Sequence, residues 1–556
     1  MAKRGWRGFV DVWRRVLART RRTATAGAGP SGSRGHSRMR AWLRAGNGRA
    51  LAWALAVVAA LSLAALAVAP APDDVTAETD EQDVDPAPTP SDSALTARLD
   101  AYLDASFPET HVPGVAVAVV DADGIVYERT KGAIPDANTP VLIGSLSKSF
   151  TAVCVMQLVE QGRVELDAPA ASYLSVTGQL PASVTVRDLL NQTSGFGYYD
   201  SLSQALERPE PGPTAGSFSY ANANYDVLGR IVEDVSGEPY ADYLRDYVLL
   251  PLGMDRSSGD AAGVLADGTP TARALVAGER NWFGAYVADG FTHASGDGAW
   301  GTGPSGYVAS SLADLGTYLR MYLDAGAVPD SGGGVRVLEP ASVSRMFFDR
   351  VPDPGGDTYY GMGWTSFTWD DGELVLSHDG SVEGYCARMV LLPERGVGIV
   401  VLTNGSDEVA GSSLFFGMAD GVVSVVAGDE PEVPDGSWYV EEHVRDDVVY
   451  AAGVLASVVA LAWVCRWRGY LERVGVATSG WQGVPERVKV GVVVRVGAFF
   501  ALAAVVATRP LAWGVPWRDL WTFVPDVSCV LVVTAALFAC AGVVRLVVLA
   551  RVLRRR

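Results

Sequence analysis

Residues 140–150 read PVLIGSLSKSF, an extended apolar run that stops at a glycine and continues into an apolar segment reaching Gly162 without a proline. The pattern predicts a buried helix whose first turn carries Ser145 and Lys148. Residues i and i+3 share one face of a helix, so a hydroxyl and an amine would be neighbours at its positive end. This pairing is typical of a serine nucleophile beside a base, with backbone N–H groups ready to bind an oxyanion.

The lysine of this stretch is unusual for the chain. Of 45 lysine and arginine residues, four are lysines: Lys3, Lys131, Lys148 and Lys489. An arginine keeps its proton in a protein, whereas burial brings a lysine amine towards neutrality, where it accepts a proton. The competing interpretation is that Ser145 caps a core helix and Lys148 is a surface charge, because Ser-x-x-Lys alone is a short pattern.

Charge is distributed unevenly along the 556 residues. Residues 1–50 carry 13 basic residues against one acidic residue, and residues 448–556 carry 13 against four. The middle holds the remaining 19 basic and 58 acidic residues. This acidic balance does not suit nucleic acid, so we expect no nucleic-acid partner. The cysteines and histidines form no cluster with metal-ligand spacing, and we expect no metal or other cofactor.

Apolar runs predict that the chain crosses a membrane. Residues 1–48 form a basic segment, and the predicted span 49–71 contains an uncharged apolar run long enough to cross a bilayer. A signal peptide cleaved near residue 69 is the alternative interpretation. The rest follows in order: a polar linker over 72–94, a domain over 95–430, a second linker over 431–447, and further spans over 448–465, 490–508 and 527–544.

Arginine clusters predict the orientation of these spans. Arg466, Arg468 and Arg473 follow the second span, and the basic tail 545–556 follows the fourth. Because positive charge accumulates on cytoplasmic segments, both clusters and the basic amino-terminal segment are expected in the cytoplasm. We therefore expect a multi-pass cell-membrane protein with both termini cytoplasmic and the acidic domain extracytoplasmic.

Within residues 95–430, strand signals lie at both ends and helical signals lie between them. Gly114–Val120 and Ile125–Thr130 are β-rich runs joined by a hairpin signal. Strands return at Leu374–Ser377, Arg388–Leu392 and Val397–Leu402. We expect an α/β (α+β) fold in which both ends of the domain form one sheet, with a helical lobe inserted between them.

Two further motifs could complete a site around Ser145. In the extended stretch Tyr220-Ala221-Asn222, residues i and i+2 point the same way, so the phenol and the amide would both face the serine. His378-Asp379-Gly380 closes a predicted strand, and its glycine allows close backbone approach to a ligand. Each motif alone is weak, because a capping asparagine beside a helix and a histidine at a strand end are more often structural.

Together and in this order, Ser145-x-x-Lys148, Tyr220-x-Asn222 and His378-x-Gly380 resemble the three motifs of the serine β-lactamase and penicillin-binding-protein superfamily. They are most similar to its class C-like branch, which includes D-Ala-D-Ala carboxypeptidases and esterases. The stretches 184–195, 225–229 and 360–364 also resemble that branch, and the resemblance covers about residues 95–428. It implies a β-lactamase/transpeptidase-like antiparallel sheet with flanking helices and an inserted helical lobe.

The resemblance also implies what each residue of the motifs does. Ser145 would attack a carbonyl carbon and form an acyl-enzyme, with either Lys148 or Tyr220 as the base. Asn222 would orient the substrate amide or the lysine, and His378 replaces the lysine that is usual in β-lactamases. Backbone N–H groups of Ser145 and of Ser381, the residue after Gly380, would form the oxyanion hole. Water or another amine would then take the acyl group.

The expected function is a membrane-anchored serine hydrolase that acts on peptide or ester bonds in a small-molecule or peptidoglycan-type substrate. A D-Ala-D-Ala carboxypeptidase or an esterase ranks first, and a true β-lactamase second, because no deacylation apparatus can be identified. A non-catalytic receptor for muropeptide or β-lactam is a different class, which an intact Ser145, Lys148 and Tyr220 disfavour. Two departures stand out: His378 is only partly charged near neutral pH, and Asp379 replaces a common threonine, although strand alternation would turn it away from the site.

Overall fold

The computed structural model describes residues 93–175, 180–259, 275–290, 299, 301–328, 334–369 and 372–554. The chain divides into two compact units. The sheet unit runs from Ala87 to Val444 and includes Trp521–Pro525, and the described part of the helical unit comprises Arg445–Leu520 and the residues from Asp526 onward. The basic segment 1–48 and the expected span 49–71 lie outside the described residues.

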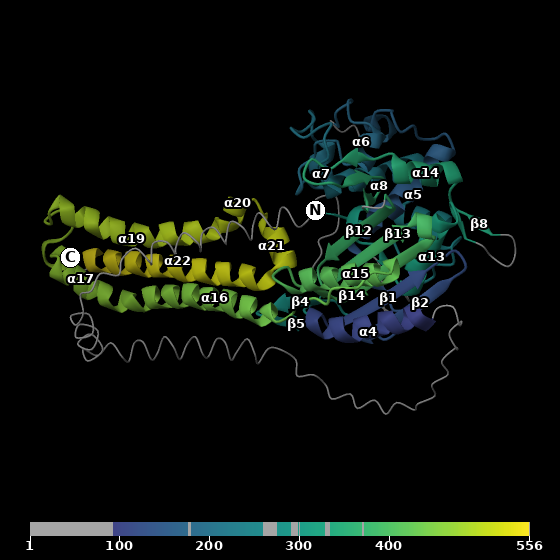
Figure 1. Cartoon of the computed structure of the whole chain (residues 1–556). Helices are drawn as coiled ribbons and strands as arrows, with labels where there is room; N and C mark the ends of the chain where they lie inside the picture. The colour runs from purple at the N-terminus through teal and green to yellow at the C-terminus, as the bar shows by residue number, and fades with distance from the viewer. Residues whose placement is uncertain are drawn as a thin grey trace. The chain divides into compact units, whose positions relative to one another are not determined.

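An eight-stranded antiparallel sheet organises the sheet unit (Figure 1). Its two amino-terminal strands lie at one edge, and β1 pairs with β14 from Val115–Thr403 to Val120–Gly398. The expectation that both ends of the domain share one sheet is confirmed. In spatial order the strands are β2 (Ile125–Gly132), β1 (Gly114–Val120), β14 (Val397–Thr403), β13 (Tyr385–Leu392), β12 (Leu374–Val382), β11 (Trp364–Thr368), β10 (Tyr359–Gly361) and β9 (Val351–Pro352).

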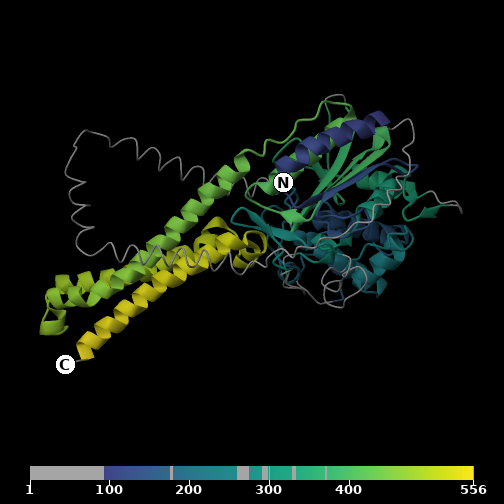
Figure 2. The ribbon, with the colours of Figure 1, turned by 90° about the horizontal axis from the view of Figure 1, so that it is seen from below.

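Helices cover both faces of this sheet. One face packs against α4 (Ser93–Thr110) and α15 (Gly411–Ala427) in an apolar cluster, and Figure 2 shows α4 as the purple helix along the sheet. The larger cluster on the other face contains α5 (Ser147–Glu160), α8 (Asn222–Ser236) and α13 (Leu312–Leu323). Every residue of β1 and β13 is therefore buried, which explains why these strands are nearly continuous apolar runs.

The helical lobe lies between β2 and β9 in the sequence. Its core helix is α5, whose residues from Ser147 to Leu158 are all buried, as the apolar run predicted. Around it lie η3 (Ala170–Tyr173), α6 (Val186–Leu190), α7 (Leu202–Leu206), α9 (Tyr240–Leu244), a π-helical turn η4 (Arg245–Leu249), α12 (Gly303–Gly306) and α14 (Pro340–Phe348).

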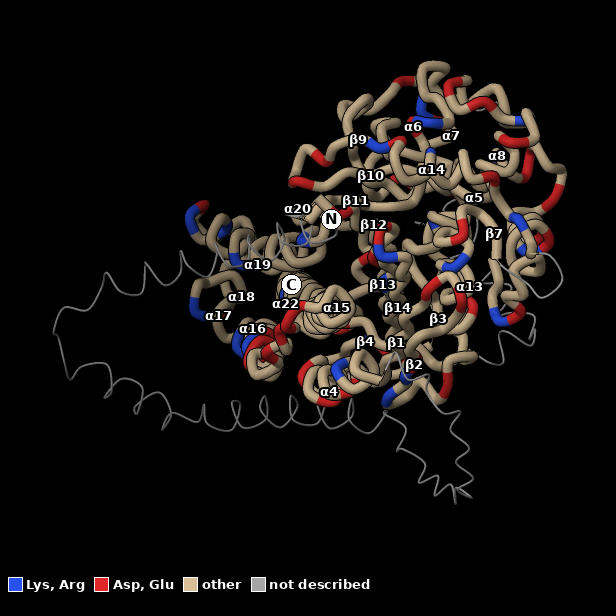
Figure 3. The backbone as a smooth tube through the Cα atoms, turned by 45° about the vertical axis from the view of Figure 1, so that its right-hand side comes forward, with Lys and Arg blue, Asp and Glu red and all other residues tan. Residues whose placement is uncertain are grey.

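Short strands complete the sheet unit. They form three small sheets: β3 (Val141–Leu142) with β6 (Ala309–Ser310); β15 (Gly405–Ser406) with β4 (Glu279–Trp282) and β5 (Ala285–Val287); and β7 (Ala327–Val328) with β8 (Val335–Arg336). Aspartate and glutamate are spread over the outer helices and loops of the unit (Figure 3), so its negative charge is not confined to one face.

Three described helices are long and apolar enough to cross a membrane: Trp438–Arg473, Glu486–Ala507 and Pro525–Arg554. The expected spans 448–465, 490–508 and 527–544 lie within these helices, apart from Thr508, which lies just beyond the second. Within the helical unit, the indole N–H of Trp467 donates to the carbonyl of Arg545 at 3.0 Å. The Arg545 guanidinium lies 3.7 Å from the ring centroid of Phe499, and that of Arg495 lies 4.9 Å from the ring centroid of Tyr470. All three helices therefore contact one another. The first of the three long helices consists of α16 (Trp438–Ala462), η6 (Trp463–Arg466) and α17 (Trp467–Arg473), the second is α19 (Glu486–Ala507), and the third is α22 (Pro525–Arg554). Shorter helices lie between them in the sequence: α18 (Val476–Ser479), α20 (Arg509–Trp513) and α21 (Trp517–Phe523).

Two glycines of α15 provide a matched test of how α4 packs on α15. A Cβ at Gly421 would lie 1.9 Å from the hydroxyl oxygen of the buried Tyr102, so Gly421→Ala must displace that ring. We expect it to lower the free energy of unfolding by about 1–3 kcal/mol. A Cβ at Gly417 would meet Pro434 at an ordinary 3.8 Å, so Gly417→Ala is expected to raise this free energy by up to about 1 kcal/mol. Chemical denaturation followed by tryptophan fluorescence measures both, and a Gly421→Ala chain as stable as the parent contradicts the packing.

Candidate active site

Ser145 lies in the 3-10 turn η2 (Gly144–Leu146), between β3 and α5. The predicted helix therefore begins at Ser147, just after the serine and not before it. From Pro140 to Leu158, Ser145 is the one residue that is not buried. The turn thus presents a single hydroxyl at the surface of an otherwise enclosed stretch.

Lys148 is buried beneath this serine. Its Nζ donates to Ser145 Oγ at 3.0 Å, to Asn222 Oδ1 at 2.8 Å and to the Ser305 carbonyl at 2.5 Å, which uses all three donors of an ammonium. The side chain is 0 % exposed, so the interpretation of Lys148 as a surface charge is wrong. Burial lowers the pKa of Lys148 to about 7, and part of the population carries a neutral amine near neutral pH.

Tyr220 approaches the serine from the other side. Its hydroxyl donates to Ser145 Oγ at 2.7 Å, and the Lys148 amine lies 4.7 Å from its ring centroid. The extended stretch ends at α8, which begins at Asn222, so the phenol and the amide both reach the Ser145–Lys148 pair. Burial raises the pKa of Tyr220 well above its usual value, which makes the phenolate the disfavoured form. The side-chain carbonyl of Gln192 fixes the stretch by accepting from the Ala221 N–H at 3.0 Å.

His378 is buried and uncharged at neutral pH. Its Nδ1 lies 2.8 Å from the Asp379 carbonyl, which can only accept, so this nitrogen carries the proton. Its Nε2 lies 3.3 Å from the Tyr360 hydroxyl and accepts from it. Burial, and next the charge of Lys148, lower the pKa of His378 to about 4. The sequence-based expectation of a partly charged histidine is therefore corrected, because a lone histidine gives no signal of its burial.

The strand β12 lies directly against the turn that carries the serine. A Cβ at Gly380 would lie 2.1 Å from the Ile143 carbonyl oxygen, and one at Gly144 would lie 2.5 Å from the Ser381 nitrogen. Gly144 also has a φ of +57°, which disfavours other residues. Two glycines therefore allow the two backbones to meet, and the close approach at Gly380 is to the Ile143 backbone.

The pairing of β12 directs the Ser381 N–H towards this turn. β11 pairs with β12 only as far as Ser377, so the following residues have an open edge. On the other side, Val382 and Tyr385 flank a two-residue hairpin and form a hydrogen-bonded pair with β13. Because such pairs alternate, the N–H of Ser381 points away from β13, towards the open edge, where a Cβ at Gly144 would lie 2.5 Å from the Ser381 nitrogen.

Asp379 belongs to the opposite face of the sheet. Its carboxylate accepts from Arg388 Nε at 2.6 Å and Nη2 at 2.9 Å, and the same guanidinium also contacts Asp420 of α15. The alternation of the strand thus turns Asp379 away from Ser145. Arg388 is likewise engaged on the far face and is not available at the site.

Some residues of the site were missed by sequence reasoning. The carbonyl of Ser305 completes the Lys148 contacts, Gln192 holds the Tyr220 stretch, and Tyr360 contacts the histidine. Asp226 lies one helical turn after Asn222 and within the stretch 225–229, and the i+4 spacing is a signal that could have found it. A carbonyl such as that of Ser305 has no sequence signal, because every residue carries one.

The family model described as Beta-lactamase matches residues 94–415, more than half of the chain. The chain belongs to the Beta-lactamase family. This is a family of serine hydrolases and acyltransferases, and the resemblance carried by the three motifs is confirmed at that level. The helical unit lies outside the residues that the Beta-lactamase model matches.

Several relatives accompany the Beta-lactamase match. Penicillin-binding protein 4 from Amycolatopsis lactamdurans is 31% identical over 338 residues, which cover 54% of this chain and 83% of that protein. Protein flp from Staphylococcus aureus (strain MW2) is 25% identical over 348 residues, covering 56% of this chain and 63% of that protein. Among solved structures, the octameric penicillin-binding protein homologue from Pyrococcus abyssi has 26% sequence identity and a TM-score of 0.49, covering 61% of this chain and 78% of that one.

The burial of Lys148 predicts a titration near neutral pH. The amine is protonated below a pKa of about 7 and neutral above it, because burial penalises the ammonium. NMR of the chain labelled with ¹³C at lysine Cε follows this directly, since four lysines give four signals and Lys148→Met removes one. We expect one midpoint near pH 7 in the native chain and midpoints near 10.5 after denaturation. A native Lys148 signal that titrates near 10.5 contradicts the burial argument.

Proposed function

We propose that this protein is a serine hydrolase that forms an acyl-enzyme on Ser145 and acts on peptide or ester bonds. The observation that carries the proposal is the position of Ser145 Oγ, 3.0 Å from Lys148 Nζ and 2.7 Å from Tyr220 Oη. Both groups lie within proton-transfer distance of the nucleophile. A receptor that only binds has no need of a buried amine that loses its proton near neutral pH.

In this mechanism Lys148 is the general base. Burial disfavours both the ammonium and the phenolate, so near neutral pH part of the population has a neutral amine beside a neutral phenol. This is the reactive form, because its amine can accept the proton of the Ser145 hydroxyl. Ser145 Oγ forms a bond to the substrate carbonyl carbon while its proton moves to Lys148 Nζ. The oxyanion of the tetrahedral intermediate accepts from the backbone N–H groups of Ser145 and Ser381.

Collapse of this intermediate breaks the bond to the leaving group. The proton held on Lys148 passes through the Tyr220 hydroxyl to the departing amine or alkoxide, which leaves the acyl-enzyme. Water then attacks the acyl carbon, releases the acid and returns a proton to Ser145. Asn222 contributes by holding the Lys148 amine in place through its side-chain carbonyl at 2.8 Å.

The charges of the site favour a substrate that is neutral around the scissile bond. His378 is neutral, and Arg388 is engaged by Asp379 and Asp420 on the other face of the sheet. Neither offers a free cation to a substrate carboxylate, which favours an esterase. The relative named penicillin-binding protein 4 favours the second candidate, a D-Ala-D-Ala carboxypeptidase that penicillin acylates.

Intact mass and ester turnover separate these candidates. The detergent-solubilised chain is incubated with a penicillin and, separately, with an activated acyl ester, beside Ser145→Ala as the control. We expect ester hydrolysis that falls by about 10³-fold or more in Ser145→Ala, because the nucleophile is lost. A stable penicillin adduct absent from Ser145→Ala supports the carboxypeptidase, and rapid penicillin turnover supports a β-lactamase. The absence of any adduct or serine-dependent turnover rejects the hydrolase and favours a receptor.

We also propose that the sheet unit is extracytoplasmic and that both termini are cytoplasmic. Three described helices are long and apolar enough to span a membrane, and the predicted span 49–71 would be the fourth. Arginines in the carboxyl-terminal part of the first and of the last of these helices favour this orientation through the excess of positive charge on cytoplasmic segments. The natural substrate of the sheet unit would then be an extracytoplasmic small molecule or a peptidoglycan-type peptide.

Reporter fusions test this topology. Alkaline phosphatase, which is active outside the cytoplasm, is fused after Asp447 and, separately, after Pro485, which lie before and after the second predicted span. We expect activity from the first fusion and none from the second, and a fluorescent protein that folds in the cytoplasm serves as the reciprocal control. Phosphatase activity from the fusion after Pro485 contradicts the proposed orientation.

A further inference from the structure

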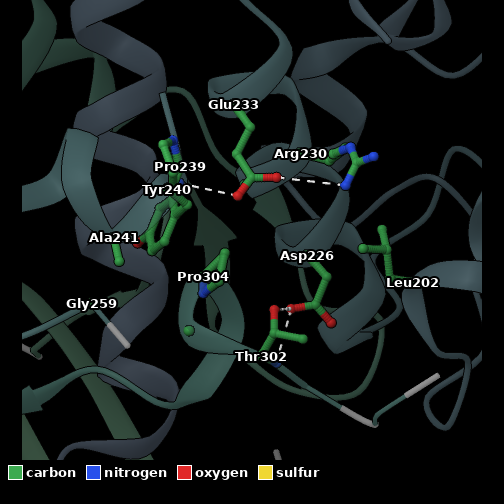
Figure 4. A pocket seen from close by; sticks show the side chains of 12 residues that line it. Leu202, Asp226, Arg230, Glu233, Pro239, Tyr240, Ala241, Gly259, Thr302 and Pro304 are labelled. Carbon is green, nitrogen blue, oxygen red and sulfur yellow. Dashed lines mark hydrogen bonds and ion pairs between the residues drawn. The ribbon is translucent and has the colours of Figure 1, made fainter. Parts of the chain in front are cut away.

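A buried carboxylate lies behind Lys148, and the mechanism above does not use it. Asp226 belongs to α8, one turn after Asn222, and is 1 % exposed. Figure 4 shows its side chain directed at Thr302, which precedes the short helix α12. A fully buried carboxylate is costly unless other groups stabilise its charge, so its contacts show what it does there.

Hydrogen bonds connect Asp226 to the amine in three steps. Asp226 Oδ1 accepts from the Thr302 N–H at 3.1 Å and from its hydroxyl at 2.6 Å. The same Thr302 N–H donates to Ser305 Oγ at 3.0 Å, which closes the turn. The carbonyl of Ser305 accepts from Lys148 Nζ at 2.5 Å. A change at Asp226 therefore moves the acceptor that holds the amine.

The packing of α12 on α8 leaves this turn little freedom. A Cβ at Gly229, on α8, would lie 2.2 Å from Pro304 Cγ. Pro304 is buried between Thr302 and Ser305, and its carbonyl accepts from the Thr151 hydroxyl of α5 at 2.7 Å. The Thr302–Ser305 turn is thus packed between α8, which carries Asp226, and α5, which carries Lys148.

The charge of Asp226 also acts on the Lys148 amine. Burial lowers the pKa of Lys148, and the carboxylate of Asp226 raises it. Three other titratable groups face the amine, Tyr220, Tyr225 and His378, and burial favours the neutral form of each. Burial also raises the pKa of Asp226, while its contacts with Ser305 and Thr302 and the charge of Lys148 lower it. Among the described residues that face Lys148, Asp226 is therefore the carboxylate that can balance the ammonium.

The surroundings of Asp226 itself hold two further charges and one phenol. Glu233, also on α8, accepts from the Tyr240 N–H at 3.1 Å and forms an ion pair with Arg230 at 3.7 Å. These charges largely offset each other, and the hydroxyl of Tyr240 pairs with that of Thr151 at 2.7 Å. The buried pair that remains is one ammonium and one carboxylate, Lys148 and Asp226.

We propose that Asp226 is a positioning residue for acylation: it fixes the Thr302–Ser305 turn that holds the Lys148 amine, and its carboxylate stabilises the ammonium formed when Ser145 gives up its proton. This inference rests on the proposed function. In the transition state a proton moves from Ser145 to an enclosed amine, and a fixed anion behind that amine needs no reorganisation to stabilise the new charge.

The charge is tested with Asp226→Asn, which keeps a side-chain oxygen for Thr302 and removes the negative charge. We expect the lysine Cε midpoint of Lys148 to fall by about one pH unit, because an opposite charge has been removed. The acid limb of ester turnover shifts in the same direction. Glu233→Gln removes a carboxylate from the same helix and is expected to leave both unchanged. A Lys148 midpoint that does not move in Asp226→Asn overturns the electrostatic role.

The link to the turn is tested with Thr302→Val, which keeps the charge and removes the hydroxyl that donates to Asp226. We expect kcat for the ester to fall about tenfold with KM unchanged, because the amine is misplaced relative to Ser145. An unchanged kcat in a folded Thr302→Val chain overturns the positioning role. If Asp226→Asn does not fold, Thr302→Val by itself tests whether Asp226 positions the amine. The NMR midpoint needs no turnover, so a shifted midpoint in a chain that hydrolyses no ester rejects the proposed function and leaves the effect of Asp226 on Lys148 in place.

Discussion

The burial of one amine is the constraint on which the candidate site depends. The three donors of Lys148 reach acceptors from three separate segments: the turn with Ser145, the start of α8 at Asn222, and the carbonyl of Ser305 in α12. A buried donor left without an acceptor costs about 1–3 kcal/mol, and more when it is charged. The helices of the lobe therefore supply acceptors around this amine. The burial that makes these acceptors necessary also lowers the pKa of Lys148.

The sheet divides the chemistry of the unit into two faces. His378 and Gly380 lie on the face of the helical lobe, while Asp379, between them, lies on the face of α15 with Arg388. Strand alternation alone produces this separation. As a result, an ion pair and a site built from neutral partners coexist one residue apart, and the arginine does not compete with the proposed chemistry.

Much of the fold could be predicted because its signals are local. The apolar run after Ser145 predicted the helix α5, and the β-rich runs at both ends of the domain predicted the sheet. The errors lie at boundaries: β12 extends to Val382, beyond the predicted Ser377, because an alternating strand continues through its polar residues. β13 likewise begins at Tyr385 and not at Arg388.

The candidate site was predictable where its residues form motifs and unpredictable where contacts are tertiary. Tyr220 and His378 were found through their neighbours in sequence, yet the charge state of His378 depends on burial by segments far away along the chain. Ser305 contacts the Lys148 amine through its backbone carbonyl, and Asp226 acts through a turn 76 residues later in the sequence. Contacts of this kind exist only after the lobe has folded onto the sheet.

The pairing of β1 with β14 has a consequence for how the protein is made. The hairpin of β1 and β2 is synthesised early, but the strand that covers its inner edge ends at Thr403, after the entire helical lobe. At ordinary rates of translation the wait between β2 and β14 lasts roughly 15–55 s. During that interval the backbone N–H and C=O groups of β1 remain an open edge, which is a template for pairing with another chain. The nascent chain therefore needs protection of β1 until β14, its partner in the sheet, has emerged from the ribosome.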